Sequence, residues 1–400
     1  MKWIVNQAGH RERYAIARAL HERGQLNALW TDLWVNSRAG WLGLAPKRIA
    51  GRLRDHFHGD LPASHVRSCM GALLLHEFYA RAFRHRGSDR VLKKNVWWEG
   101  ITLSRLRGNL APADVFFCYC YGMDRAVARA KANGMRVILG QIDPGPVEDR
   151  KVEELTRKHS AYRDSFRPGS VDYYEKWRRE CQLADRIVVN STWSADALVQ
   201  AGVPPQKLAV IPLVHTPPER TKGWARAFPE RLDDNRRLRV LFLGQCILRK
   251  GIAEVIEAAK ALVYAPVEFR FVGNTNIENF SGHFGEARIS YFPRVSRAEC
   301  EAHYQWADVF LFPTHSDGFG LTQLEAQGWG LPMITSSFCG EVVRHGETGW
   351  VLEEVTADAI VKALRESVAK PETLRRYSSN IRPWHFTIND LGRRLTELAL

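Results

Sequence analysis

Two carboxylates and a pair of glycines stand together in the second half of the chain. Asp317 opens the loop Gly318-Phe319-Gly320, and Glu325 follows eight positions after Asp317 on an expected helix. A helix N-terminus behind glycines presents free backbone N–H groups and a positive dipole end to an anion. Carboxylates beside it suit hydroxyl groups, which need hydrogen-bond acceptors. A phosphorylated sugar carries both kinds of group, so this segment predicts a site for such a ligand.

A second loop, residues 244–251, carries cations in the corresponding place. An apolar strand ends at Gly244, and Arg249, Lys250 and Gly251 stand directly before the next expected helix. Two cations at a helix N-terminus are placed to meet a diphosphate. The alternative is an Arg-Lys pair on the surface with no ligand, but the preceding strand and glycine favour the diphosphate.

Strands and helices alternate through both halves of the chain, which places these loops after strands. Apolar runs predict strands at Trp3–Asn6, Leu26–Trp30, Val115–Tyr119, Val137–Leu139, Leu208–Pro212, Val240–Gly244, Glu268–Gly273, Ile289–Phe292, Val309–Phe312 and Met333–Ser336. Helical spacing predicts helices at Gly71–Arg84, Asp124–Asn133, Ser194–Ala201, Ile252–Leu262, Arg297–Trp306 and Leu321–Trp329. Repeated βαβ units form parallel sheets with right-handed crossovers. We therefore predict an α/β protein.

Prolines at 212, 217 and 218, followed by charged residues up to 239, mark a linker between two units. We expect one Rossmann-like domain over residues 1–215 and a second over residues 216–385. Residues 386–400 are expected to form a C-terminal helix that packs back on the first domain. Two parallel sheets on either side of the linker would face each other across a deep cleft, and ligands bind at the carboxyl ends of such strands.

The two loops together resemble the retaining, GT-B-fold glycosyltransferases of family 4 (glycosyl transferases group 1). The matching segments are GQCILRKG at 244–251 and DGFGLTQLEAQGWGLPMI at 317–334, and ADRIVVNSTWSADAL at 184–198 and HGETGWVLE at 345–353 also look like family segments. The paired motifs at this separation are specific together. The resemblance is dense in the second half and reaches back to about Val115, whereas residues 36–95 match no segment of the family.

The resemblance implies a role for each matching residue. Lys250, helped by Arg249, would hold the donor diphosphate. Glu325 would hydrogen-bond the nucleotide ribose, and Asp317 would lie against the transferred sugar. Further donor contacts are expected from Gly244, Gln245, Gly251, Asn274, Arg294, Gly318, Phe319, Gly320, Leu321 and Thr322.

Some positions depart from the family pattern. The family usually has Arg directly after the first glycine, where this chain has Gln245, and the first acid is usually Glu, where it has Asp317. Many members carry a His on the first domain's cleft strand, where this chain offers Gln141 and Asp143. The candidates for the acceptor side are Gly9, His10, Asp124, Gln141 and Asp143. A cap, a turn or a satisfied core position explains each of them as well.

The chemistry needs a stabilised diphosphate leaving group, and fixed cations with helix dipoles can supply that stabilisation without a metal. No Asp-x-Asp motif appears in a cleft-facing loop, because Asp233-Asp234 lies in the linker. We therefore expect no metal and no cofactor, the nucleotide-sugar being a substrate. Retention by the hydrolase route needs two carboxylates about 5 Å apart, and the sequence nominates no such pair. The resemblance implies front-face transfer instead.

Positive charge is concentrated in the first half of the chain. Residues 1–215 hold 34 Lys and Arg against 21 Asp and Glu, whereas residues 216–400 hold 23 of each. Basic residues interleave with apolar ones over Trp41–Ile49 and around Val96-Trp97-Trp98, which is typical of a surface that meets an anionic membrane. A basic surface with no partner is the alternative. The sequence contains no nucleic-acid recognition motif, so no nucleic acid is expected as a partner.

The expected location is the cytoplasm, peripheral on the inner face of the membrane. Seven scattered cysteines favour a reduced compartment. The first twenty residues lack the apolar core of a signal peptide.

The predicted function is the transfer of a sugar from a nucleotide-sugar to a saccharide or lipid-linked glycan of envelope or exopolysaccharide synthesis, with retention of anomeric configuration. One alternative is a catalytically inactive scaffold on the same fold, which Gln245 and Asp317 favour. Another is a nucleotide-sugar epimerase.

Overall fold

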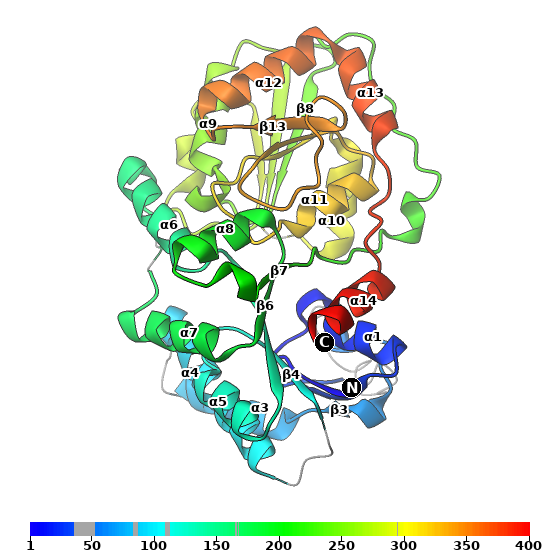
Figure 1. The fold of residues 1–400 in the computed structure, drawn as a ribbon. Coiled ribbons are helices and arrows are strands. Elements are labelled where there is room, and N and C mark those ends of the chain that lie inside the picture. Colours follow the sequence, from blue (N-terminus) through cyan, green and yellow to red (C-terminus); the bar gives the residue numbers. More distant parts are fainter. Residues whose placement is uncertain (36–52, 83–86, 109–112, 165, 167, 294) are drawn as a thin grey trace.

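The computed structural model describes residues 1–35, 53–82, 87–108, 113–164, 166, 168–293 and 295–400. Within them the chain forms two parallel sheets covered by helices (Figure 1). The prediction of an α/β protein built from two Rossmann-like units is confirmed. No helix in the described part of the chain is both long and apolar enough to cross a bilayer. The segment Trp41–Ile49, predicted to meet a membrane, lies outside the described residues.

The first sheet has the strand order β3-β2-β1-β4-β5-β6-β7. Its strands are β1 (Trp3–Asn6), β2 (Leu26–Trp30), β3 (Val66–Arg67), β4 (Val115–Tyr119), β5 (Arg136–Gly140), β6 (Arg186–Val189) and β7 (Leu208–Val210). The helices around it are α1 (Ala15–Glu22), α3 (Met70–Ala82), α4 (Gly87–Arg107), α5 (Asp124–Ala132), α6 (Pro146–Lys158), α7 (Val171–Leu183) and α8 (Thr192–Gln200). A one-turn 3₁₀ helix, η1 (Arg11–Tyr14), follows β1 directly.

The second sheet has the strand order β10-β9-β8-β11-β12-β13. Its strands are β8 (Leu238–Leu243), β9 (Val267–Val272), β10 (Ile289–Phe292), β11 (Val309–Phe312), β12 (Met333–Ser336) and β13 (Gly349–Leu352). Its helices are α9 (Ile252–Ala261), α10 (Arg297–Trp306), α11 (Leu321–Gly328), α12 (Ala357–Ala369) and α13 (Pro371–Asn380), with the short η7 (Leu248–Lys250) before α9.

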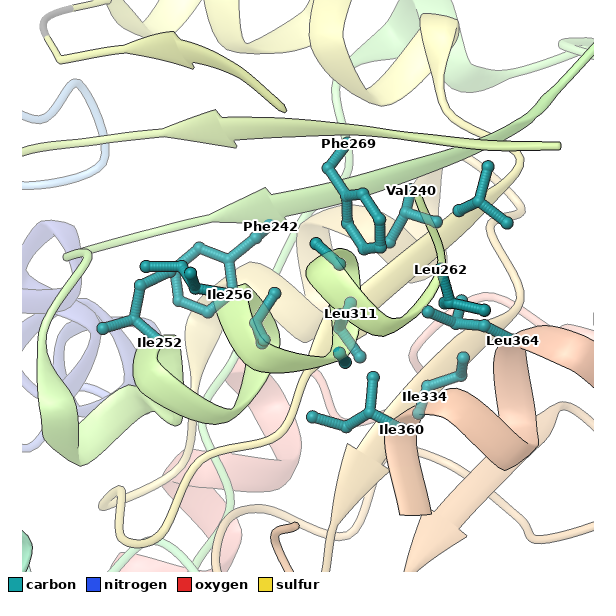
Figure 2. Close-up of a cluster of buried hydrophobic side chains, with 14 of the residues drawn as sticks. Val240, Phe242, Ile252, Ile256, Leu262, Phe269, Leu311, Ile334, Ile360 and Leu364 are labelled. Carbon is teal, nitrogen blue, oxygen red and sulfur yellow. The ribbon is translucent and has the colours of Figure 1, made fainter. Parts of the chain in front are cut away.

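Strand β8 shows why the sequences of these strands are continuous apolar runs. Val240 and Phe242 point to the face of the sheet that α9 and α12 cover, where Ile252 and Ile256 of α9 meet them (Figure 2). Leu241 belongs to the core on the opposite face. A parallel sheet covered on both faces buries every position of its central strands, so its strand ends, where the loops emerge, are the places left for polar chemistry.

The last helix, α14 (Ile388–Leu398), lies against α1 and not against the sheet that precedes it in the sequence (Figure 1). The hydroxyl of Thr396 donates a hydrogen bond of 2.8 Å to the side chain of Gln25. A Cβ added at Gly392 would lie 2.9 Å from the carbonyl oxygen of Ala19. This close approach of two helices requires glycine at position 392.

Apolar side chains of α3 and α4 are exposed at some positions and buried at others. Trp98, grouped in the sequence with a predicted membrane surface, is only 3% exposed and packs into the core. Val96 is 49% exposed. The ring of His76 on α3 stacks on Trp97 of α4 at 4.9 Å, which leaves Leu74, Leu75 and Phe78 facing outward.

Candidate active site

The two loops singled out in the sequence lie at adjacent strand ends of the second sheet. Strand β8 leads into η7, which carries Arg249 and Lys250, and β11 leads into the loop that carries Asp317. The Lys250 ammonium forms an ion pair with the Asp317 carboxylate. Gly251 follows with φ of 75°, and a Cβ there would lie 2.1 Å from the carbonyl oxygen of Pro313, so glycine lets the two loops touch.

The Lys250–Asp317 pair is largely buried, with 11% and 19% of the two side chains exposed. Burial lowers the pKa of Lys250, and the charge of Arg249 lowers it further, against the opposing effect of Asp317. Burial alone would raise the pKa of Asp317, but Lys250 and Arg249 bring it below its usual value. The charges of Lys250 and Arg249 thus favour the ionised form of Asp317, and an anion that replaces this carboxylate would meet the same cations.

Arg249 joins the two domains. Its Nη1 donates to the carbonyl oxygen of Ser316 at 2.7 Å and lies 3.3 Å from Oε2 of Glu148, on α6 of the first domain. The Ser316 hydroxyl donates to the same Glu148 oxygen at 2.9 Å. Burial raises the pKa of Glu148 to about 7, and repulsion from Asp143 and Asp317 acts in the same direction. The sequence analysis missed Glu148 as the partner of Arg249.

The Asp317 loop also packs directly on the first domain. The Ser194 hydroxyl of α8 donates to the carbonyl oxygen of Gly318 at 3.2 Å. A Cβ at Gly318 would lie 2.3 Å from the carbonyl oxygen of Ile142. Gly318 thus allows contact between the domains beside Asp317, in addition to any contact its backbone makes with a ligand.

Glu325 lines a cavity between the two sheets. The cavity has a volume of about 1060 Å³. From the second domain it is lined by Cys300, Glu301, Tyr304, Leu321, Glu325 and Trp329, and from the first by Ala8, Gly9, His10, Arg11, Glu12, Arg13, Ala15, Arg18, His58 and Asp60. The connecting segment contributes Val214, His215, Thr216 and Pro218. A cleft between two Rossmann-like units is a common place for a nucleotide ligand.

Tyr304 of α10 fixes the carboxylate of Glu325, since its hydroxyl donates to Oε2 at 2.8 Å. One Glu325 oxygen is thereby engaged while the side chain still borders the cavity. The sequence analysis missed Tyr304. Its position in α10, a helix that precedes the motif, carried no local signal.

The remaining donor-side candidates lie in several surroundings. Gln245 and Asn274 are exposed at neighbouring strand ends, and Gly244 and Thr322 are partly exposed. Phe319 is 4% exposed, and its ring packs 5.9 Å from that of Trp384, so its side chain contributes to the core. Arg294 lies outside the described residues.

The acceptor-side candidates separate into two groups. Gly9 and His10 line the cavity. Gln141 and Asp143 belong to a buried network outside the cavity lining, in which Gln141 Nε2 donates to the Tyr121 hydroxyl and to Asp143, both at 2.9 Å. Asp124 is buried at the start of α5, 3.1 Å from the guanidinium of Arg179. These bonds satisfy the three side chains within the first domain.

Three comparisons relate this arrangement to known proteins. Residues 226–384 match the family model described as Glycosyl transferases group 1. The capsular polysaccharide biosynthesis glycosyltransferase CapM of Staphylococcus aureus is 30% identical over 164 residues, which make up 39% of this chain and 40% of that protein. The chain spans about half the length of the curated relatives it matches.

Solved structures match over nearly the whole chain. The catalytic domain of starch synthase IV from Arabidopsis thaliana, bound to ADP and acarbose, has a TM-score of 0.66 at 11% identity and covers 100% of this chain and 98% of that one. HepE of Anabaena in complex with UDP-glucose has a TM-score of 0.58 at 12% identity, covering 99% and 98%. The chain has the GT-B fold. In GT-B terms, the cavity lies between the two Rossmann-like units and is bordered by both.

Proposed function

We propose that the protein is a retaining, nucleotide-sugar-dependent glycosyltransferase of family 4. The observation that carries the proposal is the position of Glu325 in the cavity between the two sheets, on the helix that follows the Lys250–Asp317 pair. The family match of residues 226–384 supports it. The UDP-glucose complex of HepE and the name of CapM support a nucleotide-sugar donor and a saccharide or lipid-linked acceptor of envelope polysaccharide synthesis.

In this proposal the donor diphosphate replaces the Asp317 carboxylate as the ion-pair partner of the Lys250 ammonium. The ammonium already has a negative partner in Asp317, and a diphosphate offers a stronger one. Arg249 adds a second positive charge at the same strand end, and the two cations stabilise the leaving diphosphate with no metal or cofactor required. Glu325, held by Tyr304, accepts hydrogen bonds from the ribose. Asp317 then lies beside the transferred sugar.

The test compares Lys250→Gln and Glu325→Gln with two control changes at exposed positions of the second domain that do not line the cavity, Lys362→Gln and Glu353→Gln. Thermal shift with a panel of nucleotide-sugars identifies the donor, because a bound ligand raises apparent stability. Titration of that donor should then give an affinity weakened about tenfold or more in each site variant, the expected cost of losing one charged hydrogen bond. Unchanged affinity in both site variants would refute the proposal.

Product analysis separates the alternatives. Transfer to an added saccharide acceptor with the anomeric configuration of the donor supports the retaining enzyme. Conversion of the nucleotide-sugar with no acceptor present would establish the epimerase. Donor binding without any turnover across a panel of lipid-linked and saccharide acceptors would favour the inactive scaffold.

We also propose that the first domain binds the cytoplasmic face of an anionic membrane through α3. Leu74, Leu75 and Phe78 are 65%, 74% and 75% exposed on one side of that helix. Exposed Arg67 and Lys93 lie on the neighbouring β3 and α4, and the excess positive charge of the chain lies wholly in its first half. An apolar face edged by cations suits an anionic bilayer.

Cosedimentation with liposomes at low and high salt tests the membrane proposal. Phe78→Ser and Leu75→Ser should weaken binding to vesicles containing anionic lipid, whereas Tyr264→Ser, at a site 93% exposed on the second domain, should not. Binding by the unaltered protein should fall as salt rises. No sedimentation at low salt would overturn it.

A further inference from the structure

The first domain presents arginines to the cavity from the loop that follows β1. Arg11 and Arg13 both line the cavity and are exposed to solvent. Among the described residues, no carboxylate lies within ion-pair distance of either guanidinium. The guanidinium carbon of Arg11 lies over the ring of Tyr119, 5.2 Å from its centroid. A ring face accepts none of the in-plane hydrogen bonds that the five N–H donors of the guanidinium can make.

The backbone of this loop is held in an unusual shape. Glu12, Arg13 and Tyr14 have φ of 49°, 50° and 61°, the left-handed region that side-chain-bearing residues rarely adopt. Buried Gln7 donates to the carbonyl oxygen of Arg11 at 2.8 Å. Three consecutive residues in this region make the backbone of the loop strained. Such strain persists where the surrounding structure fixes it, and it clusters at binding sites.

Asp32 anchors the other end of the loop. Its Oδ1 accepts a hydrogen bond of 2.7 Å from the backbone N–H of Gly9, and its Oδ2 lies 2.9 Å from the ammonium of Lys94. The Asp32 side chain is 1% exposed, so its carboxylate interacts with these partners and not with solvent. The arginines are therefore carried on a loop that is tied down by buried groups of its own domain.

Arg18 adds a third arginine to the same wall. Arg18 donates from Nε to Asp60 at 2.9 Å, and His58 lies 3.5 Å from the same oxygen. Burial, followed by the charges of Arg18 and Arg13, lowers the pKa of His58 to about 4. His58 is accordingly neutral at pH 7 and adds no charge to this wall.

On the wall formed by the first domain, the acids Glu12 and Asp60 stand against three arginines, while Glu301 and Glu325 line the side formed by the second domain. Asp60 is shared between Arg18 and His58, and Glu301 pairs with Arg220 at 2.9 Å. Burial raises the pKa of Glu12 to about 7, so this side chain is partly protonated near neutral pH. The wall formed by the first domain thus keeps a surplus of positive charge inside a cavity that a ligand can enter.

We infer that Arg11 and Arg13 form a binding site for a phosphate or carboxylate group of the acceptor, and that the acceptor is consequently an anionic saccharide or lipid-linked saccharide. This inference rests on the proposed function. Under that function, the donor ribose at Glu325 borders this cavity from the second domain, whereas the cations assigned to the donor diphosphate, Lys250 and Arg249, are not among its lining residues. The cations of the first domain are thus left for the second substrate, which must approach from that side.

The experiment uses the full chain with Arg11→Gln, Arg13→Gln and the double variant, and Arg365→Gln on the outer face of α12 as the matched exposed control. Glucose 6-phosphate and glucuronate are the anionic probes, and glucose is the neutral one. Calorimetric titrations are run with and without saturating donor nucleotide, so that the donor diphosphate site is filled in one arm. A direct titration of the nucleotide into each variant gives the donor affinity.

The expected result is that an anionic probe binds the nucleotide-saturated protein more tightly than glucose does. The double variant should weaken that binding about tenfold or more, with the affinity for the nucleotide and for glucose unchanged within about twofold. Equal probe affinity in the double variant and in Arg365→Gln would overturn the inference. So would a loss of nucleotide affinity as large as the loss of probe affinity, because the anion would then be the donor diphosphate.

The two proposals fail separately in this design. If no nucleotide binds the unaltered protein, the donor assignment fails, while the probe titration without nucleotide still shows whether the arginines bind an anion. If the nucleotide binds and neither anionic probe depends on Arg11 or Arg13, only the acceptor inference is lost.

Discussion

His159 of the first domain donates a hydrogen bond of 2.8 Å to the Glu254 carboxylate of the second. His315, two residues before Asp317, places its Nε2 3.0 Å from the same Glu254 oxygen. One carboxylate therefore ties the end of α6 and the start of α9 to the loop that carries the proposed donor site. Glu254 is 2% exposed, so the contact is a buried one between the domains.

Glu254→Gln should lower the free energy of unfolding by about 3 kcal/mol at pH 7, the usual cost of breaking a buried charged pair. Burial alone would raise the pKa of Glu254, but hydrogen bonds and charge from His159 and His315 bring it well below its usual value of 4.5. A depressed carboxylate pKa stabilises the fold above the unfolded value and loses that effect as pH falls. The difference from wild type should thus shrink as pH falls below about 4.5.

Urea denaturation from pH 3.5 to 7.5 measures that difference. Glu257→Gln is the matched control, since Glu257 stands on the same helix, is 48% exposed and lies 3.8 Å from His159. A pH-independent difference for Glu254→Gln, or an equal one for Glu257→Gln, would contradict the assigned role.

Glu148→Gln should change how the free energy of unfolding depends on pH. The direction of the change should be opposite to that expected for Glu254→Gln. The pKa of Glu148 is raised from 4.5 to about 7, so the folded chain holds a proton that the unfolded chain releases. Wild-type stability should therefore fall between pH 4.5 and pH 7 relative to the Gln variant, by up to about 1.4 kcal/mol for each pH unit in that window. Parallel pH profiles from thermal unfolding would show that Glu148 is not perturbed.

Tyr304→Phe should weaken donor affinity about three- to tenfold, because Glu325 loses the hydrogen bond that fixes its carboxylate. The fold should be unaffected, since the ring is retained. Tyr264→Phe, at an exposed tyrosine, serves as the control. Nucleotide titration provides the measurement, and an affinity equal to that of the control would separate Glu325 from ribose binding.

Asp317→Glu should keep the ion pair with Lys250 and retain most of the transfer activity, whereas Asp317→Asn should remove the buried negative partner. The asparagine variant leaves an ammonium that is 11% exposed without its counter-charge, which we expect to cost about 3 kcal/mol of stability. Thermal unfolding and turnover, measured together, check both variants. Equal stability of Asp317→Asn and wild type would show that the pair is not energetically coupled.

Gly318→Ala should weaken the contact between the domains, because the added methyl would meet the carbonyl oxygen of Ile142 at 2.3 Å. Gly100→Ala, where a Cβ has no neighbour within 4 Å, is the control. Small-angle scattering should report a wider particle, and transfer activity should fall, for the first variant alone. An unchanged radius of gyration with full activity would argue against a tight contact here.

The parallel strands could be predicted closely from the sequence, because burial on both faces makes each one an apolar run with polar ends. Several strands have the bounds that the sequence predicts: Trp3–Asn6, Leu26–Trp30, Val115–Tyr119, Ile289–Phe292 and Met333–Ser336. Helix α6 was not predicted, since its surface is polar and only a few of its side chains are buried. Pro146 at its first turn, with Glu148 and Asp149 behind it, was the available signal.

The partners of the site residues could not be predicted, because they come from distant parts of the sequence. Local spacing identified Lys250 and Asp317 as chemistry-bearing residues but gave no reason to pair them. Arg249 meets Glu148, 101 positions earlier, and Glu325 meets Tyr304 on a separate helix. The position of Arg11 and Arg13 in the cavity could not be predicted from the sequence either. Only the fold brings the loop after β1 opposite α10 and α11.

The packing of α14 on α1 bears on how the chain folds as it is synthesised. Leu391 and Leu395 complete the apolar cluster that α1 and β1 begin, so that layer is formed by the two ends of the chain. A ribosome releases the N-terminal residues long before the last helix emerges, and domains generally fold as they appear. The first domain must therefore keep one side of α1 uncovered until α14 has emerged. The core of the second domain comes from residues 228–377, apart from Leu155 and Tyr162 of the first domain, and can reach its final packing before α14 emerges.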